Sequence, residues 1–181
     1  MAYGEIQGSS WLQETLREPL PLALTVHTEK SRSALLIASI LIALRKLPQH
    51  QVSLFSGTDF SVDPGQGLNG GCDFIVSRSP EQLFVSAPVF IGVEAKNENI
   101  KGGLAQGMAA MIAAQLFNDR KGSVVAAVYG AVTPGTNWRF LKLEPGTVYI
   151  DQREYCIDRV EKILGILVFI VDVNCPVLPE L

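Results

Sequence analysis

The chain has 181 residues, enough for one domain with a hydrophobic core and too few for two ordinary domains. Hydrophobic residues make up 48% of the chain and charged residues 18%, a balance that argues against intrinsic disorder. The net charge of −3 argues against a basic coat protein for nucleic acid, although an enzyme can still contact nucleic acid through a local basic patch.

The two longest apolar runs, 34–44 and 163–171, are well short of the roughly 20 residues that a membrane-spanning helix needs. Residues 1–14 lack the basic region followed by an apolar region that marks a secretory signal. The three cysteines have neither metal-type nor redox-type spacing, which is typical of reduced thiols. We therefore expect a cytoplasmic protein that does not bind a membrane.

The N-terminal part of the chain predicts two helices. Residues 9–21 predict a short helix that ends at Pro19 and Pro21. A longer helix is predicted from Thr28 or Glu29 to Leu47, where Pro48 stops it. Its middle is apolar nearly all round, as expected for a helix that is covered on more than one side.

Strands and a further helix follow. Strands are predicted over 52–62, 72–78 and 89–96, with a strand extension or minor strand over 83–88, a helix over 102–117 and a buried strand over 123–133. The glycine-rich loop 63–71 lacks the Gly-Lys-Ser/Thr ending of a phosphate-binding P-loop, and we expect tight turns there.

The C-terminal third predicts a hairpin and a last helix. Residues 137–143 and 147–151 flank a turn at Pro145 and Gly146, and the helix is predicted from about Asp151 through 163–171. This order of elements predicts one α/β (α+β) domain over 1–181, with a central mixed sheet flanked by helices.

The stretch FIGVEAKNENI (90–100) ends an apolar strand with a charged pair. Because strand side chains alternate between faces, Glu94 and Lys96 point to one face, and Ile91, Val93 and Ala95 point to the other. An exposed ion pair of this kind contributes only about 0–1 kcal/mol, and the pair taken alone would favour that interpretation.

Asp73 gives the charged pair a third member. If 72–78 and 89–96 are antiparallel neighbours, the carboxylates of Asp73 and Glu94 converge at one rim of the sheet, with Lys96 beside them. Two neighbouring carboxylates repel each other unless a cation joins them, and oxygen ligands suit Mg²⁺ or Mn²⁺. The alternative role of Asp73 is to close a turn after the sequence Asn-Gly-Gly that precedes Cys72.

The residues Cys72-Asp73, followed by Val93-Glu94-Ala95-Lys96, resemble the motif of the PD-(D/E)XK nuclease superfamily. The resemblance spans about residues 28–133 and implies a restriction endonuclease-like core, with the hairpin and helix of 134–181 outside it. It also implies that Asp73, Glu94 and the backbone carbonyl of Ala95 hold Mg²⁺ (or Mn²⁺), while Lys96 assists the attacking water. Many members have a proline before the first acid, where this chain has Cys72.

Two further residues match that superfamily more loosely. Gln106 lies where many members have a glutamine early in the helix after the motif, but a solvated residue fits that position equally well. Glu29 is the best candidate for a glutamate on the first helix of the core. Its alternative, interaction with the helix dipole worth about 0.5 kcal/mol, is the interpretation that the sequence favours.

We therefore expect metal-dependent hydrolysis of phosphodiester bonds in DNA. The first alternative is a nuclease-like fold that has lost cleavage and serves as a binding or assembly module, which would not bind metal at Asp73 and Glu94. The second is an enzyme of another class that uses Lys96 as a nucleophile or base, and whose activity would survive chelation of divalent metal.

The last helix also bears on assembly. Its polar face disappears after Lys162, and an apolar half-helix needs cover on both sides. A second copy of the chain in a two-fold homodimer would supply that cover. The alternative is that the first long helix packs there within one subunit.

Overall fold

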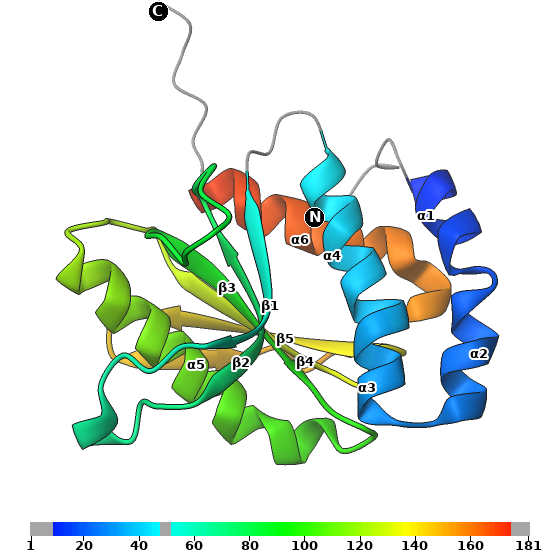
Figure 1. Ribbon diagram of the computed structural model, residues 1–181, viewed down its shortest axis with the longest axis horizontal. Helices are drawn as coiled ribbons and strands as arrows, with labels where there is room; N and C mark the ends of the chain where they lie inside the picture. Colours follow the sequence, from blue (N-terminus) through cyan, green and yellow to red (C-terminus); the bar gives the residue numbers. More distant parts are fainter. Residues whose placement is uncertain (1–8, 48–51, 175–181) are drawn as a thin grey trace, which may run out of the picture.

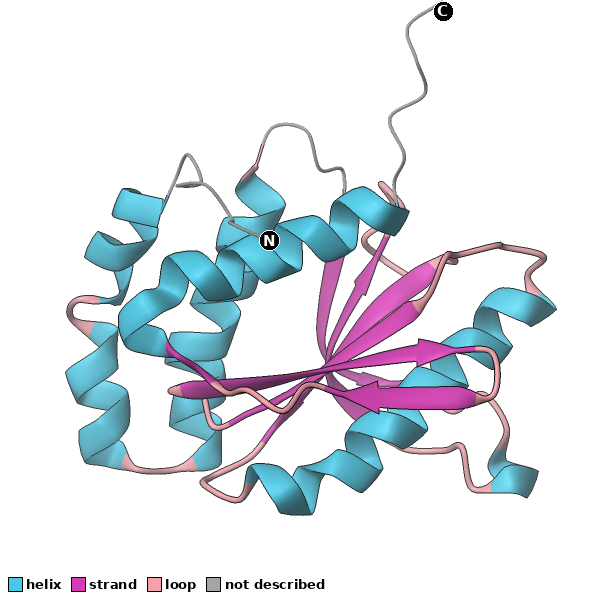
Figure 2. Cartoon of the chain, turned by 180° about the vertical axis from the view of Figure 1, so that it is seen from behind, coloured by secondary structure: helices cyan, strands magenta, loops and turns pink. Residues whose placement is uncertain are grey.

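In the part of the chain that the structure describes, a mixed β-sheet of seven strands runs through the middle of the molecule, with helices on both faces (Figures 1 and 2). The structure is a computed structural model, and it describes residues 9–47 and 52–174. The strands are β1 (Ser53–Asp59), β2 (Gly71–Ser77), β3 (Val89–Ala95), β4 (Val128–Thr133), β5 (Asn137–Glu144), β6 (Thr147–Ile150) and β7 (Tyr155–Cys156).

The strands lie side by side in the order β1 to β6, and β7 also pairs with β5. Among these described pairs, β3 and β4 are parallel and the others are antiparallel. The helix α5 (Ile100–Arg120) makes the crossover between the two parallel strands, which a short turn cannot connect. The predicted mixed sheet flanked by helices is confirmed.

The first helix differs from its prediction. The predicted short helix is α1 (Ser9–Leu16), which ends before Pro19, but Pro19 and Pro21 belong to a second helix, α2 (Pro19–Val26), that was not predicted. Proline lacks only an N–H that the first turn of a helix leaves unpaired, and its fixed φ suits that turn. Pro19 and Pro21 therefore lie at the start of α2 and inside it, respectively.

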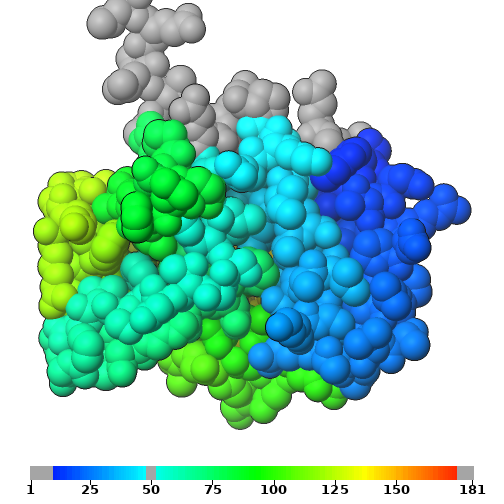
Figure 3. Space-filling model, viewed as in Figure 1, coloured from blue at the N-terminus to red at the C-terminus, as the bar shows by residue number. Residues whose placement is uncertain are grey.

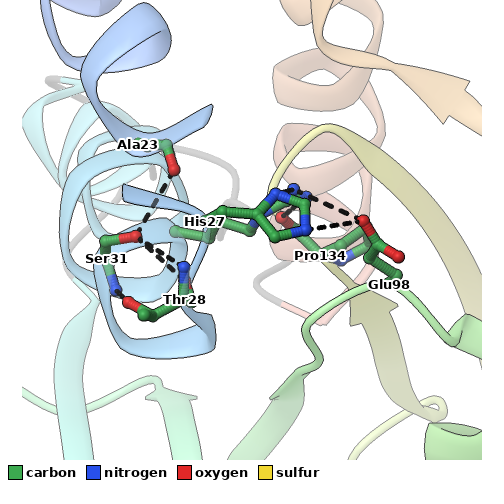
Figure 4. Close-up of polar contacts among 7 residues, drawn as sticks. Ala23, His27, Thr28, Ser31, Glu98 and Pro134 are labelled. Carbon is green, nitrogen blue, oxygen red and sulfur yellow. Dashed lines mark hydrogen bonds and ion pairs between the residues drawn. The ribbon is translucent and has the colours of Figure 1, made fainter. Parts of the chain in front are cut away.

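The long helix is confirmed over Glu29–Lys46, and Pro48 lies outside the described residues. It consists of α3 (Glu29–Arg32), a π-helical turn η1 (Ser33–Ile37) and α4 (Ala38–Lys46). Thr28 caps it by accepting a hydrogen bond from the Ser31 N–H, while the Ser31 hydroxyl oxygen accepts one from the Thr28 N–H (Figure 4). The π-helical turn was not predicted, because nothing in the local sequence distinguishes it from an apolar α-helix.

The minor strand predicted over 83–88 is wrong. These residues are irregular, and Leu83 and Phe84 are strongly exposed. The Gln82 side-chain amide occupies the edge of β1 instead, donating to the Leu54 carbonyl at 2.7 Å and accepting from the Leu54 N–H at 3.3 Å. Two backbone groups on the edge strand are thereby satisfied without a further strand.

The predicted start of the last helix at Asp151 is also wrong. Pairing with β5 keeps the chain extended as far as β7, after which a 3₁₀ turn (η3, Ile157–Arg159) leads into α6 (Val160–Asn174). The predicted hairpin of β5 and β6 is confirmed. Strand β4 begins at Val128, later than predicted, while α5 extends beyond its predicted range at both ends.

The sheet separates two hydrophobic cores. One core contains side chains of α1, the long helix and α6, and the other lies between the sheet and α5. Most of the apolar half of α6 is buried, with α1 and α4 packed against it. The long helix therefore covers α6 within one chain, as the alternative to a dimer predicted, and the homodimer remains a prediction without that support.

None of the helices in residues 9–47 and 52–174 is both long and apolar enough to cross a bilayer.

Candidate active site

Asp73 and Glu94 lie side by side at one end of the sheet. Strands β2 and β3 are antiparallel neighbours, as predicted, with Phe74 opposite Val93, a register that sets Asp73 opposite Glu94 on the same face. The Asp73 Oδ2 atom accepts a hydrogen bond from the Ala95 N–H at 2.8 Å. This contact ties the two predicted acidic positions together, although 20 residues separate them in the sequence.

The predicted alternation along β3 is confirmed. Ile91, Val93 and Ala95 belong to the core beneath the long helix and α6. Glu94 and Lys96 point toward α5, where the stem of Lys96 lies against Gly103. Gly103 has no side chain, and this allows helix, lysine and sheet to approach one another closely.

Glu94 and Lys96 are not an exposed surface pair. The Lys96 Nζ atom lies 2.8 Å from the Glu94 Oε1 atom, and only 6% of the surface of Glu94 is exposed. Burying a carboxylate is costly unless a cation and hydrogen bonds compensate it, whereas an exposed pair costs and contributes little. The interpretation of Glu94 and Lys96 as an exposed ion pair therefore does not describe their environment.

The electrostatics of the site centre on Glu94. Burial raises the pKa of Glu94 above its ordinary value, the hydrogen bond from Lys96 opposes this rise, and the negative charges of Asp73 and Glu29 raise the pKa further. Glu29 is thus close enough to Glu94 for its charge to act there. Several carboxylates with a single lysine make a site that is short of positive charge.

A pocket of about 220 Å³ opens beside Glu94. One wall comes from the glycine-rich loop, and the other comes from Gln106 and three alanines of α5 (Ala109, Ala110 and Ala113). Figure 3 shows the segment that carries β1, this loop and β2 on the surface, between the long helix and α5. Gln106 therefore lines the pocket that Glu94 also lines, while Asp73 and Lys96 are at the rim of the sheet next to it.

The loop 63–71 is held in place by contacts at both of its ends. Gly67 and Gly70 have positive φ angles, the backbone conformation that favours glycine, as expected for tight turns. Arg120 on α5 donates to the Val62 carbonyl and to the Asp63 carboxylate, and the Phe60 N–H donates to the Gly70 carbonyl. The sequence predicted the turns but not that Arg120 would anchor the loop to α5.

Cys72 also lines the pocket, and its environment makes it inert. Burial, with a further contribution from the Glu94 charge, raises the pKa of the Cys72 thiol to about 12. The thiolate is the reactive form of cysteine, so this thiol is neither a nucleophile nor a ready metal ligand.

The donor set fits a hard divalent cation bound by few protein ligands. Within residues 9–47 and 52–174, no group of three or more His, Cys, Asp or Glu side chains is placed to hold a metal ion. Mg²⁺ commonly uses one or two carboxylates and completes its shell with water and substrate phosphates. Asp73 and Glu94 meet that smaller requirement, and the shortage of positive charge around Glu94 favours a cation there.

Comparison of the chain with protein-family models, with curated proteins and with solved structures found no significant match.

Proposed function

We propose that this protein is a metal-dependent nuclease that hydrolyses phosphodiester bonds in DNA through a restriction endonuclease-like core. The observation that carries the proposal is the position of buried Glu94 opposite Asp73, with the Lys96 ammonium 2.8 Å from the Glu94 carboxylate. A pocket lined by Gln106 lies directly beside them. Two carboxylates and a lysine ammonium next to a pocket form a group suited to phosphoryl transfer.

Asp73, Glu94 and the backbone carbonyl of Ala95 would hold Mg²⁺ or Mn²⁺. Backbone groups of successive strand residues point alternately to the two neighbouring strands. The Ala95 N–H meets Asp73 on β2, while the Lys96 N–H donates to the Thr133 carbonyl on β4. Ala95 thus presents its polar backbone groups on the Asp73 side. A bound metal ion would activate a water molecule and neutralise charge that develops on the phosphate.

Lys96 contributes a fixed positive charge at the same place. Its stem rests on Gly103, and its ammonium group is directed to Glu94, so the lysine is oriented before any substrate binds. In the reaction the ammonium group would stabilise negative charge on the phosphate oxygens and orient the attacking water. Gln106, on the pocket wall, would hydrogen-bond to water or substrate, and Glu29 would add negative charge that strengthens cation binding.

The test is incubation of the purified protein with supercoiled, linear, branched and single-stranded DNA, with Mg²⁺ or Mn²⁺ and with a chelator. Cleavage should require metal, and Lys96→Ala should abolish it while leaving metal affinity unchanged. Asp73→Asn should weaken metal binding itself. Lys101→Ala is the matched control, because Lys101 is an exposed lysine in the first turn of α5. Equal cleavage by parent, Lys96→Ala and Asp73→Asn would reject the proposal.

A second candidate function is a nuclease-like module that binds or assembles without cleaving. The observation in its favour is that only two carboxylates face each other across β2 and β3, while Lys96 already pairs with one of them. Calorimetric titration with Mn²⁺ separates the two candidates. The nuclease should bind Mn²⁺ in a manner that Asp73→Asn weakens, and the module should not bind it.

A further inference from the structure

A buried arginine lies at the end of the sheet where the candidate active site is found. Arg32, on the long helix, is only 5% exposed, and the sequence did not single it out. One of its terminal nitrogens lies 3.0 Å from the His27 Nδ1 atom, and the other donates to the Pro134 carbonyl at 3.5 Å. His27 in turn lies 3.0 Å from the Glu98 carboxylate, as Figure 4 shows.

The direction of these hydrogen bonds sets the tautomer of a neutral His27 ring. Arginine can only donate, so the His27 Nδ1 atom accepts from Arg32, and the proton of the neutral ring is on Nε2. The Nε2–H group therefore donates to the Glu98 Oε1 atom, which lies 4.0 Å from the nearer Arg32 nitrogen. An anion at the Glu98 position thus meets one imidazole donor and the field of a guanidinium group.

Arg32 has few hydrogen-bond partners for a buried charged group. Its Nε atom is buried without a hydrogen-bond partner in the described structure, and its contact with the Pro134 carbonyl is at the limit of a hydrogen bond. The opposing carboxylate at 4.0 Å is beyond hydrogen-bond distance. Buried polar atoms without a partner are rare in native proteins, and an absent ion is one of their recognised causes.

The anion that now faces this pair is easily displaced. The Glu98 side chain is 66% exposed, so it can move into solvent while Arg32 stays buried. The His27 ring is about half exposed, so a ligand from solution can reach its Nε2–H group. Glu98 and His27 lie on different elements, the segment after β3 and the end of α2 (Figure 4).

We propose that His27 and Arg32 form a binding site for a phosphate group of the nucleic-acid backbone, which the Glu98 carboxylate occupies in the free protein. The placement supports this assignment, because Glu98 follows Lys96 by two residues and Arg32 follows Glu29 by one helical turn. A nucleic acid with one phosphate at Lys96 would bring another phosphate past His27. Identification of the phosphate as part of a nucleic acid rests on the proposed function, whereas binding of a phosphate ion does not.

The first experiment follows the His27 ring by NMR during titration with inorganic phosphate. The chain has two histidines, and His27→Asn assigns the signal, because asparagine tolerates the positive φ of 56° at this position. Phosphate should shift the His27 signal, and Glu98→Gln should lower the apparent Kd about tenfold by removing the internal anion. Asp119→Asn is the matched control, since it removes the same charge from an exposed site near the end of α5 and should leave the Kd unchanged.

The second experiment measures binding of a fluorescent DNA oligonucleotide by anisotropy in the presence of chelator. Glu98→Gln should tighten binding more than Asp119→Asn does, and His27→Asn should weaken it. A His27 signal that does not move with phosphate, or equal affinities for Glu98→Gln and Asp119→Asn, would overturn the anion site. Phosphate binding without any DNA binding would leave the anion site standing and would reject the nuclease proposal together with nucleic acid as the ligand.

Discussion

The contact between α5 and the sheet can be tested with a single methyl group, in the variant Gly103→Ala. A Cβ atom built at Gly103 would lie 2.6 Å from the Val132 Cγ1 atom, 2.9 Å from the Lys96 Cγ atom and 3.0 Å from the Lys96 Cε atom. The end of a lysine side chain can move away at little cost, but Val132 is buried in a β-strand and cannot. Either α5 must shift away from β4, or the stem of Lys96 must leave its position beside Glu94.

Two opposing effects decide the stability of this variant. Alanine in place of glycine inside a helix stabilises by about 1 kcal/mol. Overpacking of a tight contact typically costs about 1–3 kcal/mol, and a contact at 2.6 Å belongs to the upper part of that range. The net change is therefore a loss of about 1–2 kcal/mol in the free energy of unfolding. For a chain of this size the midpoint temperature should fall by about 2–8 °C.

Urea unfolding with and without the substitution measures this change, with Gly92→Ala as the control. A Cβ atom at Gly92 would meet Ala110 at 3.6 Å and the Cys72 sulfur at 3.9 Å, which are ordinary contacts, so Gly92→Ala should be at least as stable as the parent. Gly103→Ala should also lose DNA cleavage more than Gly92→Ala does, because it displaces Lys96. A Gly103→Ala protein as stable as the parent would refute the close packing of α5, Lys96 and β4.

Three further predictions concern the site. Because burial raises the pKa of Glu94, the metal-free protein should lose stability as the pH rises from about 4.5 through the higher pKa of the folded state. Urea unfolding from pH 4 to 8, with chelator present, measures this loss. The variant Glu94→Gln should lack the loss, because glutamine stays neutral over this range. Mg²⁺ or Mn²⁺ at about 100 times its Kd should raise the midpoint temperature of unfolding by about 5–10 °C, and Asp73→Asn should remove this increase. A parent protein without the increase would contradict a metal site. In a Cys175→Ser background at pH 8, a thiol reagent should modify the exposed Cys156 and leave Cys72 unmodified, since burial raises the pKa of Cys72 to about 12. Rapid modification of both cysteines would show that the pocket wall opens.

Local periodicity was sufficient for the elements that carry the candidate site. The period of two along β3 placed Glu94 and Lys96 on one face, and the turn-rich sequence before β2 placed Asp73 at the start of its strand. The antiparallel pairing of β2 with β3 then brought Asp73 opposite Glu94, as predicted. These properties depend on residues close together in the sequence and on one strand pairing, so the chain by itself determined them.

The predictions that failed depended on contacts between distant segments. Pro19 is compatible with the end of a helix or with the start of the next one, and only packing of α2 selected the second. Residues 83–88 have the composition of a strand, but the Gln82 amide already occupies the edge of β1. The start of α6 was delayed because β7 pairs with β5 across the chain.

What the sequence determined by itself is the order of β1, β2, β3, α5, β4 and the β5–β6 hairpin and, once β2 and β3 pair, the convergence of Asp73 with Glu94. What only the tertiary structure decided is the environment of those groups, because burial and charge are sums over residues that are remote in the sequence. Packing of Lys96 against Gly103 turned a common charged pair into a buried one. The folded protein likewise encloses Arg32 of α3 against the segments after β3 and β4, where its guanidinium group lies near the Pro134 carbonyl, His27 and Glu98. No local pattern marks an arginine for such a position, since its burial is decided by chain segments that meet only in the folded protein.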